Sequence, residues 1–190
     1  SVVSGVTPPP PPPPPVDPPP PPPPTGGTGV TSNYTFSDQF SGVQGQNQWS
    51  YLDAAATPLV YNASAGYWLG AQPYQGLWNG GIHPGTSVGT VLRWTAPADG
   101  EAFVSGSVGL QTTSGSNGVR FTIKHNSSDI DGPTDLTTTT LRSISETVTV
   151  VAGDTIDFIV APISGNTYSS TSLMPIVLLT TDGTTPAEPT

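Results

Sequence analysis

Proline dominates one stretch near the start of the chain and restricts what that stretch can form. Fifteen of the seventeen residues at positions 8–24 are proline, and only Val16 and Asp17 interrupt them. Proline fixes φ at about −65° and disfavours the α region for the residue before it, so the tract is restricted to a polyproline II helix. At about 3.1 Å per residue, this rod would span roughly 50 Å. The tract therefore predicts a rigid spacer, and any folded core has to come from the rest of the chain.

Charge and composition exclude several classes of partner. The 190 residues include four basic and thirteen acidic side chains, so nucleic acid and anionic membranes are poor partners, because binding phosphate requires clustered Lys or Arg. No apolar run approaches the roughly 18 residues of a membrane span. The absence of cysteine excludes disulfides, thiolate metal sites and a Cys nucleophile. Charged residues make up only 9% of the chain, which favours an extracellular or cell-surface protein made soluble by hydroxyl and amide groups or by sugar.

A period of two in the hydrophobic pattern runs through the rest of the chain. Val119, Phe121 and Ile123 alternate with polar residues, residues 155–160 repeat the pattern, and no window shows a helical stripe. We expect strands near residues 34–40, 48–52, 58–62, 67–70, 88–95, 101–110, 118–125, 141–151, 154–161 and 172–180. The chain is therefore predicted to be all-β, with a single antiparallel, jelly-roll-like β-sandwich preceded by a polyproline II rod.

Shifts in composition divide the chain into four parts. Residues 1–7 are β-prone, 8–30 form the polyproline stalk and a Gly/Thr linker, 31–181 form the β-sandwich, and 182–190 form a Pro/Thr tail. The chain begins at Ser1 without a signal peptide, which we interpret as a processed product or part of a longer chain. In the first segment Val2, Val3 and Val6 are candidates for an exchanged strand that docks on the sandwich of a neighbouring copy. A disordered N-terminus is the alternative.

Three segments carry a resemblance to known proteins. They are residues 76–85 (GLWNGGIHPG), 93–100 (RWTAPADG) and 151–158 (VAGDTIDF). Together they resemble jelly-roll, carbohydrate-binding-like modules of exported bacterial proteins, and the resemblance implies that fold for about residues 34–180. The proline tract resembles those of hydroxyproline-rich wall glycoproteins. The whole chain, by its architecture, resembles a protomer of a glycan-coated extracellular fibril.

Aromatic residues concentrate between positions 61 and 85, among Gly, Gln and Asn. A sugar-binding face needs this mixture, because the C–H faces of a pyranose stack on aromatic rings while amides bond its hydroxyls. We take Trp68, Tyr74 and Trp78 as carbohydrate-contact candidates. The alternative is that these rings pack in the core, as we expect for Trp94.

Three N-x-Ser/Thr sequons make Asn33, Asn62 and Asn126 candidates for N-linked glycosylation in an exported protein. Asn126 follows an expected strand at an expected turn, and is the strongest candidate of the three. Chance matches in a chain so rich in Ser, Thr and Asn are the alternative.

Metal and catalytic signals are weak. Asp129, Asp131 and Asp135 offer the oxygen ligands that calcium prefers, but their spacing matches no standard loop, so we interpret them as solvated turn residues. His83 and His125 are isolated, no nucleophile elbow is present, and no Ser/His/Asp constellation can be recognised. We therefore expect no metal site, no cofactor and no catalytic residues.

These observations favour a non-catalytic structural subunit of an extracellular glycosylated filament or matrix, with the polyproline tract as a rigid strut. Its expected partners are other copies of the chain and attached or bound glycans. The alternative is a carbohydrate-binding module that a Pro-rich spacer joins to a secreted enzyme or adhesin.

Overall fold

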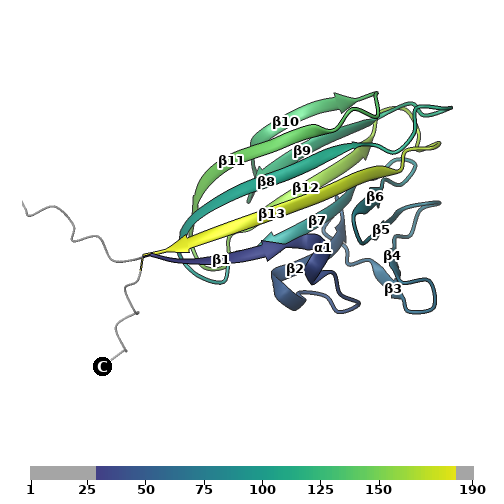
Figure 1. The fold of residues 1–190 in the computed structure, drawn as a ribbon. Coiled ribbons are helices and arrows are strands. Elements are labelled where there is room, and N and C mark those ends of the chain that lie inside the picture. The colour runs from purple at the N-terminus through teal and green to yellow at the C-terminus, as the bar shows by residue number, and fades with distance from the viewer. Residues whose placement is uncertain (1–28, 183–190) are drawn as a thin grey trace, which may run out of the picture.

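A computed structural model describes residues 29–182 as two antiparallel β-sheets packed face to face (Figure 1). The larger sheet has the order β11-β8-β13-β6-β5-β4-β3, and β1 also pairs with β13. The smaller sheet has the order β10-β9-β12-β7-β2. The strands of the larger sheet are β1 (Val30–Thr35), β3 (Val60–Asn62), β4 (Tyr67–Leu69), β5 (Gly76–Trp78), β6 (Gly81–His83), β8 (Gly100–Leu110), β11 (Arg142–Val150) and β13 (Thr171–Thr181). Those of the smaller sheet are β2 (Trp49–Asp53), β7 (Thr90–Thr95), β9 (Val119–His125), β10 (Ser128–Leu136) and β12 (Thr155–Pro162).

This architecture confirms the predicted jelly-roll-like β-sandwich. In β9 every second residue is apolar, and these residues, Val119, Phe121 and Ile123, are fully buried between the sheets. Trp94 on β7 is also fully buried, as expected. The polyproline tract and residues 1–7, with Val2, Val3 and Val6, lie outside the described residues, so their predictions remain untested.

The strand predictions fail in two ways. The strand expected over 34–40 ends at Thr35, because the short helix α1 (Phe36–Gln39) turns the Phe36 side chain into the core. A second short helical turn, η1 (Gln46–Gln48), precedes β2. The prediction also missed the three-residue strands β5 and β6, whose glycines gave no alternation, and the nine-residue β10, whose aspartates resemble a turn.

One part of the core is almost entirely aromatic. We call Phe36, Phe40, Trp49, Tyr51 and Trp68 the closed aromatic cluster. Tyr51 stacks on Trp68 with ring centroids 4.5 Å apart, and Phe36 meets Trp49 edge to face at 5.5 Å. The polar tips are hydrogen-bonded: Tyr51 Oη accepts from the backbone N–H of Ser41, Trp68 Nε1 donates to the Ser41 carbonyl and Trp49 Nε1 donates to Gln39 Oε1. Because of these bonds, the Tyr hydroxyl and the Trp N–H groups keep a hydrogen-bond partner although their rings are buried.

The two ends of the described chain lie side by side at one end of the sandwich (Figure 1). Val30 at the start of β1 pairs with Thr181 at the end of β13. The loop between β12 and β13, residues 163–170, lies at the opposite end of β13. Both flanking segments thus attach at the end of the domain that is far from this loop. Neither described helix is long and apolar enough to cross a membrane.

Candidate functional site

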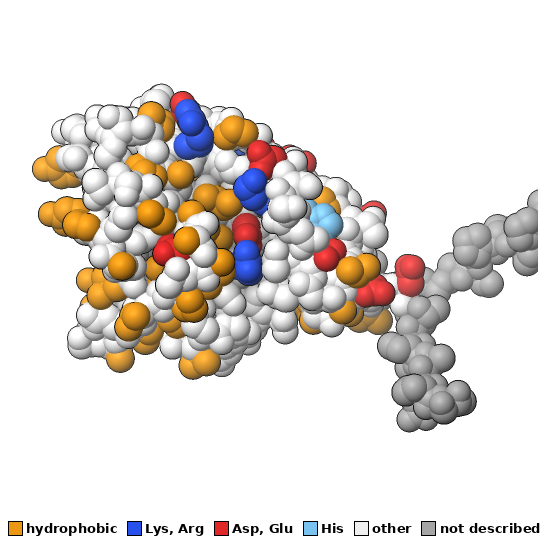
Figure 2. Space-filling view, turned by 180° about the vertical axis from the view of Figure 1, so that it is seen from behind, with side chains coloured by type: hydrophobic (Ala, Val, Ile, Leu, Met, Phe, Trp, Pro, Cys, Tyr) orange, Lys and Arg blue, Asp and Glu red, His pale blue; other side chains and the backbone are white. Residues whose placement is uncertain are grey.

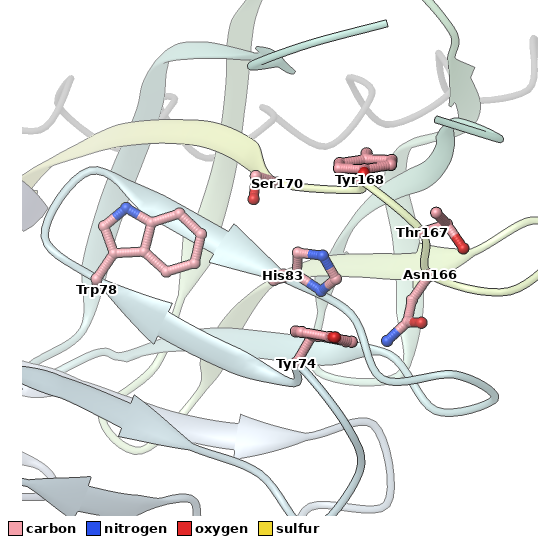
Figure 3. A pocket seen from close by; sticks show the side chains of 7 residues that line it. All are labelled: Tyr74, Trp78, His83, Asn166, Thr167, Tyr168 and Ser170. Atoms are coloured by element: carbon pink, nitrogen blue, oxygen red, sulfur yellow. The ribbon is translucent and has the colours of Figure 1, made fainter. Parts of the chain in front are cut away.

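A hollow of about 530 Å³ opens beside β5, β6 and the loop at residues 163–170 (Figure 3). Its lining residues are Tyr74, Trp78, His83, Asn166, Thr167, Tyr168 and Ser170. As viewed in Figure 3, Trp78, His83 and Asn166 form a row, with Tyr74 on one side of it and Tyr168 on the other. We call this hollow the open aromatic pocket. It lies at the end of the domain opposite to the point where the chain enters and leaves.

Two tyrosines of the pocket are exposed in spite of their size. Tyr74 is 80% exposed and Tyr168 63% exposed. Both have positive φ, at 61° and 50°, a conformation that costs a non-glycine residue energy. Strain of this kind persists only where the surrounding structure holds it, and it is common at binding sites.

Asn166 connects the loops that carry these tyrosines, and the buried His83 shares one of its hydrogen-bond partners. Asn166 is 7% exposed, and its Nδ2 donates to the carbonyls of Pro73 (2.7 Å) and Pro84 (3.2 Å). His83 Nδ1 lies 2.8 Å from the Pro84 carbonyl. Because a carbonyl only accepts, Nδ1 carries the proton and Nε2 is left as an acceptor. Within residues 29–182, neither His83 Nε2 nor Asn166 Oδ1 has a hydrogen-bond partner, so both remain available to a ligand.

Burial also determines the charge of the pocket. It lowers the pKa of His83 below its ordinary value, and the hydrogen bond to Pro84 only partly opposes this effect. The imidazole is therefore neutral at neutral pH, and the lining residues include no Asp, Glu, Lys or Arg. The pocket combines aromatic faces, free acceptors and hydroxyl groups without a net charge.

Glycines set the positions of two pocket rings. A Cβ atom added to Gly81 would lie 2.2 Å from the Trp78 indole, which shows that this ring lies directly over Gly81. A Cβ atom on Gly115 would lie 2.9 Å from the Tyr168 ring. The absence of these two side chains is what gives the rings room to rest on the backbone.

The structure separates the three carbohydrate-contact candidates. Tyr74 and Trp78 both line the pocket, whereas Trp68 is only 3% exposed and belongs to the closed aromatic cluster. Trp68 is buried because its strand β4 packs against Tyr51 and its Nε1 bonds to backbone, so it is no part of the pocket. Sequence reasoning also missed Asn166 and Tyr168, which lie about ninety positions after Tyr74. The only local signal was an aromatic residue in a polar loop.

The sequons lie away from the pocket, and so do the aspartates considered for calcium. Asn33, Asn62 and Asn126 are absent from the pocket lining. Asp129, Asp131 and Asp135 lie on β10 rather than in a turn, and they form ion pairs with Lys124, Arg142 and Arg120 respectively.

The remaining basic residue, Arg93, pairs with Asp157 in the same way. In Figure 2 the blue side chains accordingly lie beside red ones. The described residues contain no cluster of three or more His, Asp or Glu side chains suited to a metal ion.

No protein-family model matches the chain, and no curated protein matches it. Solved structures resemble it at low identity. A family 35 carbohydrate-binding module from Clostridium thermocellum is 16% identical, covers 78% of this chain and 97% of its own, and has a TM-score of 0.38. A CBM51 from Clostridium perfringens, in complex with methyl-galactose, is 10% identical, with coverages of 76% and 99% and a TM-score of 0.37. GITRL from bushbaby is 14% identical, with coverages of 72% and 97% and a TM-score of 0.33. With scores this low, the likeness carries no argument about function.

Proposed function

We propose that the described domain is a non-catalytic carbohydrate-binding module that holds a neutral glycan in the open aromatic pocket. One observation carries this proposal: Tyr74 and Tyr168 are mostly exposed, yet strained backbone holds both of them at the rim of one uncharged hollow. Exposed aromatic residues that gather in this way favour a ligand with apolar faces. The carbohydrate-binding module, which the sequence offered as the alternative, thus becomes the leading hypothesis in place of the filament subunit.

The chemistry of the pocket suits a sugar. A pyranose ring presents C–H faces that stack on the Tyr74, Trp78 and Tyr168 rings, while its hydroxyls donate to His83 Nε2 and Asn166 Oδ1. The volume of about 530 Å³ falls within the roughly 300–1,000 Å³ of ordinary ligand pockets. Because Pro84 holds both His83 and Asn166, the acceptors are in place before the ligand arrives, which lowers the entropic cost of binding.

Binding without hydrolysis follows from the same lining residues. Glycoside hydrolysis generally uses two carboxyl groups that flank the scissile bond. Among the described residues, no Asp or Glu lines the pocket. We therefore propose that the module positions a glycan without cleaving it, outside the cell or on its surface.

Affinity measurements test the proposal. The protein is applied to an array of neutral and anionic glycans, and the best ligand is titrated calorimetrically against the wild type, Trp78→Ala and Tyr168→Ala. We expect selection of a neutral glycan and at least a tenfold loss of affinity for each variant, equivalent to about 1.4 kcal/mol.

Phe103→Ala is the matched control, because Phe103 is an exposed aromatic residue on β8, away from the pocket. Its affinity should equal that of the wild type, and all variants should keep the wild-type circular dichroism spectrum. Binding that survives both pocket substitutions would place the glycan elsewhere and reject the proposed site.

A filament subunit remains a second candidate because of one feature of the fold. Strand β11 is the last strand of the larger sheet, and within residues 29–182 it pairs only with β8. Its nine residues therefore offer a long edge on which another strand can be added. The segment with Val2, Val3 and Val6 of a neighbouring copy is the proposed donor. Normal fibre assembly after deletion of residues 1–7, seen by negative-stain microscopy, would eliminate that role.

A further inference from the structure

The three sequons differ in how the structure uses the amide nitrogen that would carry a glycan. An N-linked sugar replaces one hydrogen on Asn Nδ2, so a nitrogen without a partner accepts the sugar without loss, whereas a nitrogen that holds the fold together does not. The side-chain oxygen can stay hydrogen-bonded in either case. The partners of Nδ2 therefore distinguish the three sites.

Asn126 uses its amide to fix the turn between β9 and β10. Its Oδ1 accepts from the backbone N–H of Thr155 at 2.9 Å, which settles which end of the amide is oxygen. Its Nδ2 donates to Asp154 Oδ1 at 3.0 Å and lies 3.4 Å from His125 Nε2. The residue has a φ of 54°, so the turn itself depends on this conformation. A sugar on Nδ2 would take the space on which these contacts depend.

Asn33 has the opposite arrangement, on the edge strand β1. Its Oδ1 accepts from the hydroxyl of Thr35, the third residue of its own sequon, at 3.1 Å. Within the described part of the chain its Nδ2 has no partner, and the residue is exposed. The neighbouring Tyr34 packs edge to face on Trp94 in the core, so Asn33 points to the outer face of the sheet.

A glycan at Asn33 would also cover apolar surface. In the register of the larger sheet Asn33 lies opposite Leu178, and Leu178 lies opposite Phe103. Residues paired across antiparallel strands share one face, so the three form a row. Phe103 is 38% exposed at the end of this row. A sugar ring on Asn33 can lie over these side chains and shield them from water.

Asn62 resembles Asn33 rather than Asn126. It ends β3, and its Oδ1 accepts from the N–H and the hydroxyl of Ser64, again the third residue of its own sequon, and from the N–H of Ala65. Its Nδ2 makes no hydrogen bond to the residues that the structure describes. The amide is thus oriented by its oxygen, with its nitrogen unoccupied.

We propose that Asn33 and Asn62, and not Asn126, are the N-glycosylation sites of this protein. The donor is a glycan linked to a lipid diphosphate, in the presence of a transferase that supplies a base. Asn Nδ2 forms a bond to the anomeric carbon, the bond from that carbon to the diphosphate oxygen breaks, and the lipid diphosphate leaves with the electron pair while the base takes one Nδ2 proton. Neither site lines the open aromatic pocket, so the proposal stands or falls independently of the proposed function.

Mass spectrometry of the full chain, exported from cells that carry out N-glycosylation, tests the proposal. We expect two glycan masses on the intact protein, and one fewer in either Asn33→Gln or Asn62→Gln. Thr35→Ala should remove the same glycan as Asn33→Gln although it keeps the asparagine, and Thr35→Ser should retain it. Asn126→Gln should leave the glycan mass unchanged but lower the melting temperature, because the contacts with Asp154 and Thr155 are lost.

Three results would overturn the proposal. One is a glycan on Asn126, whatever the melting temperature of the modified protein. Another is an unmodified Asn33 or Asn62, which overturns it for that residue. The third is a chain without any glycan, which overturns it entirely. Enzymatic deglycosylation that converts each modified Asn to Asp locates the sites by peptide mapping.

Discussion

The closed aromatic cluster and the open aromatic pocket are built from the same residue types and lie in the same sandwich, but they differ in what their polar tips do. In the cluster, Trp49, Tyr51 and Trp68 are at most 3% exposed, and the polar atom of each has a hydrogen-bond partner in the protein. In the pocket, Tyr74 and Tyr168 are mostly exposed, and neither hydroxyl has a partner within residues 29–182.

This difference separates stability from binding. Rings that are buried with satisfied tips contribute transfer free energy and close packing to the fold. Rings that are exposed with free tips contribute little to folding and leave both their faces and their polar atoms to a ligand. Substitutions in the two regions should therefore affect stability and binding differently.

Truncating one ring in each region should have opposite consequences. Trp49→Ala removes a fully buried indole and leaves a cavity, so we expect a loss of about 3–5 kcal/mol in the free energy of unfolding. Tyr168→Ala removes an exposed ring and should change that free energy by no more than about 0.5 kcal/mol. Chemical denaturation of both variants measures the two values, and similar losses would contradict the comparison.

Two buried tryptophans test how much a hydrogen bond to the indole N–H contributes to stability. Trp49 Nε1 donates to Gln39 Oε1, whereas Trp94 Nε1 is a buried atom without a partner among the described residues. Trp→Phe makes the same volume change at both positions, but at Trp94 it also removes a desolvated N–H group. We expect Trp49→Phe to cost about 1–3 kcal/mol more than Trp94→Phe in denaturant unfolding. Equal costs would show that hydrogen bonding of the tip is unimportant here.

Burial could be predicted from the sequence where the pattern of a single strand determines which side chains face the core. Alternation in β9 and β12 predicted which apolar side chains face the core, because every second residue of a half-buried strand does so. It did not predict that Thr122 and Asp157, on the opposite side of these strands, are buried as well. Alternation failed at α1, because Phe36 reaches the core by a helical turn and not by its place in a strand. It also failed at β10, because Asp131 and Asp135 form ion pairs with Arg142 and Arg120 from other strands.

The pocket could be predicted only in part for a similar reason. Tyr74 and Trp78 are close in sequence and were found as a cluster. Tyr168 and Asn166 join them only because the order of strands brings β6 beside β13, and an order of strands is a long-range property. Trp68 illustrates a second limit, because composition alone does not distinguish a ring that packs in the core from a ring that lines a pocket.

The backbone under Tyr74 offers a smaller test. Its φ of 61° is unfavourable for alanine and tyrosine alike but is freely accessible to glycine. Both Tyr74→Ala and Tyr74→Gly should weaken glycan binding to the same extent, since both remove the ring. Tyr74→Gly should nevertheless be more stable than Tyr74→Ala by about 1 kcal/mol, because strain in the left-handed region is relieved. Paired thermal melts measure this difference, and an alanine variant as stable as the glycine variant would show that the conformation is not strained.

The smallest expected effect is a dependence on pH that arises in the pocket. Burial lowers the pKa of His83 below its ordinary value of 6.5, so the folded state resists protonation while the unfolded state takes up a proton. The corresponding stability is fully present above pH 6.5 and is lost as pH falls toward the lowered folded pKa. His83→Gln should lack this loss, so the difference in melting temperature between wild type and variant should shrink as the pH is lowered below 6.5.

Asp154 affects stability at more acid pH than His83 does. Hydrogen bonds from the Val151 N–H and the Asn126 side chain lower the pKa of Asp154 from 3.8 to about 2. The stability that these bonds contribute is therefore lost only as the pH falls from 3.8 to about 2. Glycan affinity should follow His83 and not Asp154, since protonation of Nε2 removes an acceptor from the pocket. An affinity that stays constant while the pH is lowered until His83 becomes protonated would show that His83 Nε2 does not accept from the ligand.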